Sequence, residues 1–134
     1  MGNRWPNIQE KRDMTGEKIL VVDDEENFRS LFSKTLEKAG YHVKTAENGA
    51  DAFHLLRQEN FELGLIDLKM APVDGFTILE KIKKEYPRLK VIIVSAYSTP
   101  EFQARSLQMG ADAFLVKPIE ISELKETIQS ILSR

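Results

Sequence analysis

The sequence predicts an α/β fold, namely a three-layer, doubly wound (βα)5 sandwich with a five-stranded parallel sheet in the order 2-1-3-4-5. Two observations lead to this prediction. Five short, mostly apolar runs recur along the chain, as expected for strands that helices cover on both faces. Each run is followed by a segment whose apolar residues repeat at helical spacing. This alternation with short connections indicates a parallel sheet with right-handed crossovers.

Each predicted element has its own sequence signal. The predicted strands are the apolar runs Ile19–Val22, Val43–Ala46, Leu63–Ile66, Val91–Val94 and Ala113–Val116. The predicted helices have apolar faces made of Phe28, Leu31, Phe32, Leu36 and Ala39; Ala52, Phe53, Leu55 and Leu56; Phe76, Leu79 and Ile82; Phe102, Leu107 and Met109; and Ile121, Leu124, Ile128, Ile131 and Leu132. Gly40 is suited to end the first helix, Pro87 lies beyond the third, and Pro100 suits the first turn of the fourth.

Length and composition indicate one folded domain and exclude several classes of protein. With 134 residues, of which 42% are hydrophobic, the chain can bury one ordinary core. Its formal charge of −2 provides no basic excess, so we expect no direct contact with nucleic acid. The absence of cysteine excludes disulfides and thiolate metal sites. No apolar run is long enough to cross a bilayer and no signal-peptide pattern is present, so we expect a cytoplasmic protein without a membrane partner.

The chain divides into two regions, residues 1–17 and 18–134. The first has few large apolar residues and no periodicity, so we predict a disordered leader or linker. Docking of Trp5 onto the domain is left open. The second region contains all the predicted strands and helices.

Three acidic residues stand where predicted strands end. Asp23 and Asp24 follow the first strand, and Asp67 follows the third. In the order 2-1-3-4-5 these strands are neighbours, and a crevice opens at their carboxyl ends. Three carboxylates there would repel one another unless a cation or a proton offset them, and hard oxygen ligands favour Mg²⁺. The sequence therefore predicts a magnesium site at this edge.

A hydroxyl and an ammonium group are expected on the same rim. Ser95 ends the fourth predicted strand, and Lys117 ends the fifth. A carboxylate can attack phosphorus when a metal and a cation neutralise the incoming phosphoryl oxygens. Phosphoryl transfer requires little beyond such positioning and charge. The set of residues is therefore suited to forming an aspartyl-phosphate.

Each residue of this set also has a purely structural explanation. Asp24 alone would be a helix N-cap, and Ser95 alone a turn hydroxyl. Lys117 alone would be a solvated surface residue, and Phe114 alone a core aromatic. The combination on one rim favours the functional explanation. His42 and His54 are too distant from the acids to bind the same metal, and we expect both at the surface.

Four motifs resemble those of the response regulator receiver domain (CheY-like) of two-component signalling. They are Val22-Asp23-Asp24-Glu25; Asp67-Leu68-Lys69-Met70 with Asp74-Gly75 further on; Val94-Ser95-Ala96; and Phe114-Leu115-Val116-Lys117-Pro118. The resemblance extends from Lys18 to Leu132.

The resemblance implies a role for each motif. Asp67 would accept a phosphoryl group from a histidine kinase. Asp24, Asp67 and the backbone carbonyl of Lys69 would bind Mg²⁺, while Asp23 would act directly or through a metal-bound water. We expect Mn²⁺ to be able to replace Mg²⁺. Lys117 would pair with phosphoryl oxygens, and Ser95 would donate a hydrogen bond to one of them.

The resemblance also implies three further features around the site. Phe114 would be the aromatic residue that reports the state of Ser95, and the Lys117–Pro118 peptide would be cis. Lys69 and Tyr97 would tune hydrolysis of the aspartyl-phosphate, and we expect the bulk of Tyr97 to slow it.

The chain departs from the family pattern at two positions. Ala71 stands where proline is usual and the proline is Pro72, which biases Ala71 toward extended conformations and bears on the loop that presents the Lys69 carbonyl. Phe114 stands where many relatives have tyrosine, so packing alone would govern its movement.

The resulting functional prediction is a receiver domain that changes conformation when Asp67 is phosphorylated, rather than an enzyme with turnover. Its partners would be a sensor histidine kinase or phosphotransfer domain and a downstream protein or appended effector domain. A phosphorylation-dependent dimer is left open. Two alternatives are a Mg²⁺-dependent phosphotransferase or phosphatase and a pseudo-receiver that only binds partners. A flavodoxin-like cofactor carrier would share the topology, but the acids after the first strand would repel its phosphate.

Overall fold

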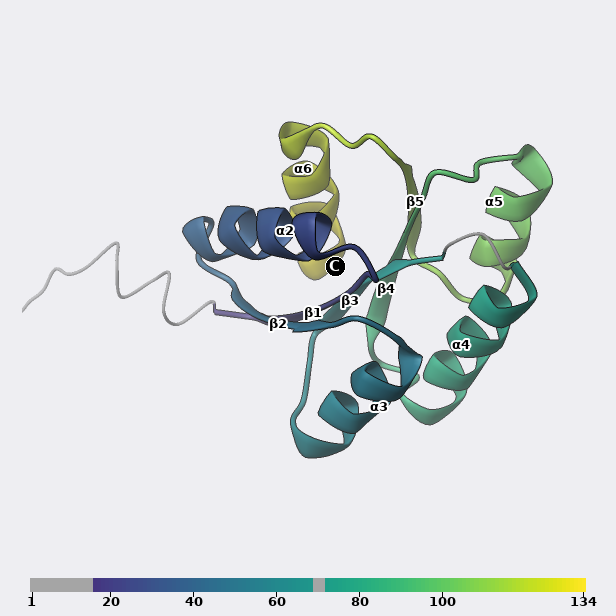
Figure 1. Cartoon of the computed structure of the whole chain (residues 1–134), viewed down its shortest axis with the longest axis horizontal. Coiled ribbons are helices and arrows are strands. Elements are labelled where there is room, and N and C mark those ends of the chain that lie inside the picture. The colour runs from purple at the N-terminus through teal and green to yellow at the C-terminus, as the bar shows by residue number, and fades with distance from the viewer. Residues whose placement is uncertain (1–15, 69–71) are drawn as a thin grey trace, which may run out of the picture.

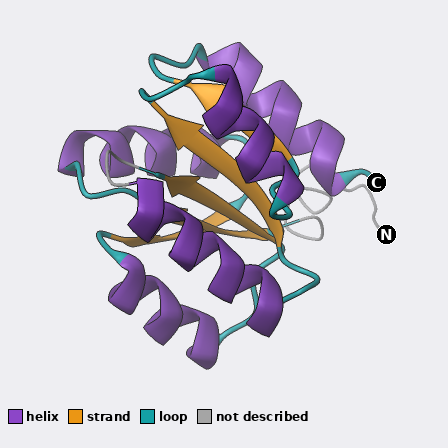
Figure 2. Cartoon of the chain, turned by 90° about the vertical axis from the view of Figure 1, so that its right-hand side faces the viewer, coloured by secondary structure: helices purple, strands orange, loops and turns teal. Residues whose placement is uncertain are grey.

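In the computed structural model, residues 16–68 and 72–134 are described. They form a parallel sheet between two layers of helices (Figures 1 and 2). The elements in chain order are β1 (Lys18–Val22), α2 (Glu26–Lys38), β2 (His42–Ala46), α3 (Gly49–Gln58), β3 (Leu63–Asp67), α4 (Pro72–Glu85), β4 (Lys90–Ser95), α5 (Pro100–Gln108), β5 (Ala113–Val116) and α6 (Ile121–Leu132).

The sheet has the order β2-β1-β3-β4-β5, and all four strand pairs are parallel. The predicted fold class and strand order are thereby confirmed. Val22 lies opposite Ile66 in the β1–β3 pair, so the two strands end side by side. The helices that follow these two strands, α2 and α4, pack on opposite faces of the sheet, as expected at such a switch point.

Two hydrophobic cores occupy the two faces of the sheet. Along β1, Ile19 and Val21 pack with α2 and α6, whereas Leu20 and Val22 pack with α3, α4 and α5. Figure 1 shows the same division, with α2 and α6 on one side and the other three helices opposite. Successive side chains of a strand point to opposite faces, so an uninterrupted apolar strand supplies both cores.

The helix boundaries have local causes. Gly40 has a φ of 101° directly after the C-cap of α2, a conformation that glycine adopts without strain. The Asn48 side chain accepts a hydrogen bond from the backbone N–H of Asp51 and caps α3. Thr99 caps α5 in the same way, with Pro100 in the first turn as predicted. The Lys117–Pro118 peptide is cis, as the resemblance implies.

Some expectations about burial are wrong. β2 and β5 are the edge strands of the sheet, and each has only one buried residue, so neither shows the burial expected of every strand. The apolar pattern also predicts Leu31, Ala39 and Leu107 on buried helix faces, but all three are exposed. In α5 the fully buried Ser106 takes the inward position beside Leu107. Apolar periodicity gives the direction of a helix face but not its width.

Among the described helices, none is both long enough and apolar enough to cross a membrane.

Candidate functional site

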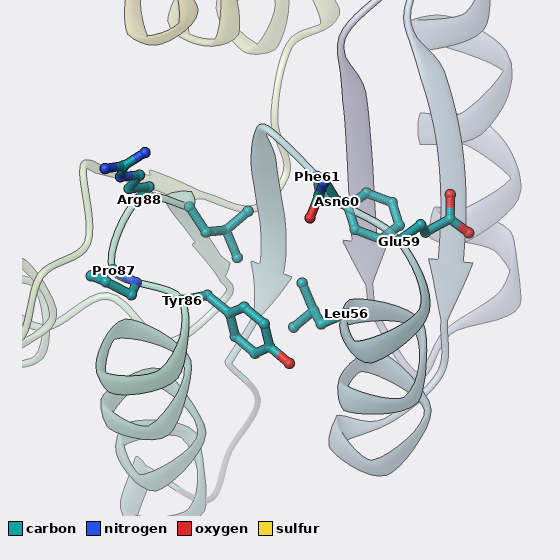
Figure 3. Close-up of a pocket in the computed structure, with 8 residues that line it drawn as sticks. Leu56, Glu59, Asn60, Phe61, Tyr86, Pro87 and Arg88 are labelled. Carbon is teal, nitrogen blue, oxygen red and sulfur yellow. The ribbon is translucent and has the colours of Figure 1, made fainter.

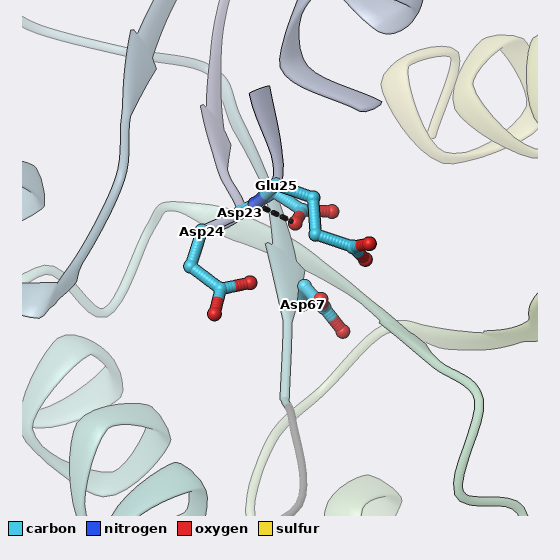
Figure 4. Close-up of side chains that lie close together, drawn as sticks. All are labelled: Asp23, Asp24, Glu25 and Asp67. Atoms are coloured by element: carbon cyan, nitrogen blue, oxygen red, sulfur yellow. Dashed lines mark hydrogen bonds between the residues drawn. The ribbon is translucent and has the colours of Figure 1, made fainter. Parts of the chain in front are cut away.

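The predicted acids lie together at the carboxyl edge of the sheet (Figure 4). Asp23 follows β1 directly, and Asp67 is the last residue of β3. Asp23, Asp24, Glu25 and Asp67 each contribute a carboxylate oxygen, and these oxygens lie within 4.8 Å of one another. The parallel β1–β3 pairing causes this convergence. Glu25 was not among the predicted site residues, although it is the next acid in the same sequence motif.

Several hydrogen bonds hold Asp23 at the end of β1. It is 3% exposed, and its Oδ1 atom accepts a 2.9 Å hydrogen bond from the backbone N–H of Glu25. The Arg29 guanidinium donates a 2.8 Å bond to the Asp23 carbonyl, and the Asp23 N–H donates to the Ala46 carbonyl. These bonds fix the turn between β1 and α2. Asp24 and Glu25 are exposed, so the site is open to solvent on that side.

Lys117 supplies the positive charge of the site. Its Nζ atom donates 3.0 Å hydrogen bonds to Asp23 Oδ2 and Asp67 Oδ2, and Glu25 Oε1 lies 3.5 Å away. The Lys117 side chain is 8% exposed. Burial alone would lower the pKa of Lys117, but hydrogen bonds and charge attraction from Asp23 and Asp67 outweigh it and raise the pKa. The lysine therefore stays an ammonium ion between two carboxylates.

Ser95 lies on the same rim, at the end of β4. Its hydroxyl is fully buried, donates a 2.7 Å hydrogen bond to the Leu68 carbonyl and accepts a 3.0 Å bond from the Tyr97 N–H. The Lys117 N–H also bonds the Ser95 carbonyl at 2.9 Å. A hydroxyl has a single proton to donate. The Ser95 proton is thus directed at the residue after Asp67.

Three aromatic rings form a row beside this rim. The Phe102 ring contacts the Tyr97 ring edge-on at a centroid distance of 5.1 Å and the Phe114 ring at 5.6 Å. Phe114 is partly buried and packs against the core that faces α3, α4 and α5. The sequence pattern predicts Phe102 only as a core residue, because helical periodicity does not show which aromatic rings a side chain will contact.

Other predicted site features have different outcomes. Asp24 does not cap α2, because Glu25 is the N-cap residue and makes no side-chain capping bond. His42 and His54 are exposed, as expected, and neither belongs to the acid cluster. Lys69 and Ala71 lie outside the described residues, as does the predicted leader apart from its last two positions.

A pocket of about 320 Å³ lies at the opposite edge, where β3 and β4 begin (Figure 3). Leu56, Phe61, Tyr86 and Leu89 form its mostly apolar wall. Its acid, Glu59, points outward in Figure 3 and pairs with Lys18 at 2.8 Å. The pocket therefore lacks the grouped charges that phosphoryl chemistry needs.

Comparison with known proteins gives a consistent result. A family model described as the response regulator receiver domain matches residues 19–129. The transcriptional regulatory protein ZraR of Salmonella typhimurium is 36% identical over 115 residues, which cover 86% of this chain and 26% of ZraR. The chain thus spans about a quarter of that relative's length.

Solved structures resemble the whole domain. A response regulator from Thermotoga maritima is 29% identical with a TM-score of 0.84, covering 88% of this chain and 98% of that one. The response regulator TrrA from the same organism, solved in complex with Mg(2+)-BeF, is 34% identical with a TM-score of 0.75, covering 86% of this chain and 98% of TrrA.

Proposed function

This chain belongs to the response regulator receiver family of two-component systems, and we propose that it is a phosphoacceptor receiver, phosphorylated on Asp67 by a histidine kinase. The observation that carries the proposal is the Lys117 ammonium, held at 3.0 Å from both Asp23 and Asp67 beside a cluster of acids. That arrangement supplies a nucleophile and a cation for the phosphoryl oxygens.

The donor set fits Mg²⁺. Four carboxylate oxygens within 4.8 Å of one another are hard ligands of the kind this ion prefers. We propose that Asp23, Asp24 and Asp67 hold it with the carbonyl of Lys69, a residue outside the described ranges. When bound, Mg²⁺ would neutralise charge on the transferring phosphoryl group. Replacement by Mn²⁺ stays a prediction.

The proposed reaction needs one displacement at phosphorus. An Asp67 carboxylate oxygen attacks the phosphorus atom of a phosphohistidine on the kinase. The P–N bond breaks, and its electron pair stays on the imidazole nitrogen. Lys117 keeps its proton throughout, because its pKa is raised, and it pairs with the phosphoryl oxygens. Its hydrogen bond to Asp67 Oδ2 places the positive charge of the ammonium beside the carboxylate that would receive the phosphoryl group.

The proposed conformational response starts at Ser95. Its proton is donated to the Leu68 carbonyl, so a hydrogen bond from Ser95 to a phosphoryl oxygen on Asp67 requires that bond to be given up. Such an exchange would change the position of the strand ends, next to the aromatic row of Tyr97, Phe102 and Phe114. Ser95 is linked to Phe114 through the backbone of Tyr97 and the ring of Phe102, and this link supports a readout through Phe114.

We propose that the chain acts through other proteins and is not a turnover enzyme. Its relative ZraR is described as a transcriptional regulatory protein, and the chain spans 26% of it. This supports an output through an effector domain or a downstream partner.

Phosphorylation with radiolabelled acetyl phosphate and Mg²⁺ tests the proposal. We expect one phosphoryl group per chain, none in Asp67→Asn, and an unchanged level in Asp112→Asn, an acid outside the cluster. Circular dichroism would establish that both variants fold. Full labelling of folded Asp67→Asn would contradict the proposal, and continuous release of phosphate from small phosphoesters would favour the phosphatase alternative.

A further inference from the structure

The ring of Phe28 lies directly against the lysine of the site. The Lys117 Nζ atom is 3.8 Å from the centroid of this ring, well inside the range of about 6 Å at which an aromatic face attracts a cation. Phe28 comes from the first turns of α2, far from Lys117 in sequence.

The position of the Phe28 ring is fixed from two sides. Phe32 lies one helical turn later with a centroid distance of 5.8 Å, is buried, and belongs to the core shared with α6. The next residue, Arg29, ties the same turn of α2 to the end of β1 through the Asp23 carbonyl at 2.8 Å. The Phe28 ring therefore forms a wall of the site, packed against the core on one side and against the Lys117 ammonium on the other.

The surroundings of the ammonium explain what this wall does. Asp23 and Asp67 accept two of its hydrogen bonds, and Glu25 lies at 3.5 Å. On the side of Phe28, an aromatic face stands where water would otherwise solvate the charge. A ring face attracts a cation but offers no lone pair that competes for the N–H donors. The N–H groups thus stay directed at the carboxylates.

We infer that Phe28 is a positioning residue of the phosphorylation site, acting through a cation–π contact that holds the Lys117 ammonium toward Asp67. This inference rests on the proposed function, in which Lys117 pairs with the incoming phosphoryl group. Without the attraction of the ring, water would reach the Lys117 ammonium and Nζ would move. Both changes would weaken the electrostatic interaction between this ammonium and the incoming phosphoryl group.

Graded fluorination of Phe28 separates this role from simple packing. Fluorine withdraws electron density from the ring face while adding little volume, so 4-fluoro- and 3,4,5-trifluorophenylalanine weaken the cation–π attraction stepwise. We expect the rate of phosphorylation by acetyl phosphate with Mg²⁺ to fall stepwise, by about three- to tenfold overall. Phe28→Leu should fall as far, whereas Phe28→Tyr should stay within about twofold of wild type because it keeps the ring.

The chain offers a matched control. Lys81 Nζ lies 4.7 Å from the centroid of Phe53, a second lysine–phenylalanine contact that is remote from the acid cluster. The same fluorinated series at Phe53 should leave the phosphorylation rate unchanged. In the unphosphorylated protein, the Lys117 side-chain protons should show an upfield ring-current shift by NMR that Phe28→Leu removes.

The outcomes are distinguishable. A normal phosphorylation rate across the Phe28 series, in protein that melts like wild type, would overturn the positioning role and leave the proposed function standing. If the Lys117 side-chain protons of the wild type show no upfield ring-current shift, the positioning role is likewise overturned and the proposed function stands. A wild-type chain that accepts no phosphoryl group would overturn the proposed function and this inference together.

Discussion

The Ser95 hydroxyl donates its proton to the backbone carbonyl of Leu68 over 2.7 Å, which connects the end of β4 to the residue after Asp67. The same oxygen accepts the N–H of Tyr97, so one buried hydroxyl satisfies a donor and an acceptor. In the unphosphorylated chain this bond stabilises the rim.

Ser95→Ala should therefore destabilise the domain. It leaves the Leu68 carbonyl and the Tyr97 N–H without these bonds in a buried place, at a cost of about 1–3 kcal/mol in the free energy of unfolding. Urea unfolding followed by circular dichroism measures the difference. Ser106→Ala is the matched control, because that buried hydroxyl donates its hydrogen bond to the Phe102 carbonyl within its own helix, so its loss should cost much less. Equal costs for the two variants would contradict a special role for Ser95.

Mg²⁺ should stabilise the domain through the acid cluster. By mass action, a free Mg²⁺ concentration of 100 times the Kd adds about 2.7 kcal/mol to the free energy of unfolding. Asp24→Asn should remove most of this gain, measured as a shift in melting temperature. Asp24 suits the test better than Asp23, since Asp23 is buried and hydrogen-bonded to the Glu25 N–H. Glu126→Gln, an exposed acid on α6, should keep the full shift, and an undiminished shift in Asp24→Asn would argue against the metal site.

The sequence predicted the fold and the acid site because both depend on local rules. Apolar runs fixed the strands, and strand ends placed Asp23, Asp24 and Asp67 at one edge. Arg29 and Phe28 could not be assigned in the same way, since their contacts depend on how α2 lies across the end of β1 and on the conformation of the Lys117 side chain. The Ser95–Leu68 bond was also unpredictable, because any carbonyl on the rim could have accepted that proton. The roles of Lys69 and Tyr97 stay predictions.

Lys117 should make stability depend on pH in the alkaline range. Its pKa is raised in the folded state, so its stabilising contribution is complete below the unfolded value of about 10.4 and is lost as pH rises through the folded value. The free energy of unfolding of the wild type should thus decline above about pH 10.4. Lys117→Met should lack this part of the decline, whereas Lys125→Met, an exposed lysine on α6, should retain it. Identical pH profiles for the two variants would show that Lys117 is not the group responsible.

Tyr97 should slow hydrolysis of the aspartyl-phosphate. Its backbone N–H donates a hydrogen bond to the Ser95 hydroxyl, which places Tyr97 at the rim. The residue is 46% exposed, and its ring packs edge-on against Phe102. A ring on the solvent side of the rim can obstruct water that approaches Asp67. Tyr97→Ala removes this bulk without touching Asp67 or Lys117, so autodephosphorylation should accelerate, and a tenfold change corresponds to about 1.4 kcal/mol of barrier. Tyr97→Phe keeps the ring and should decay like wild type. Intact mass spectrometry after removal of the phosphodonor follows the decay, and an equal or slower rate in Tyr97→Ala would contradict shielding by the ring.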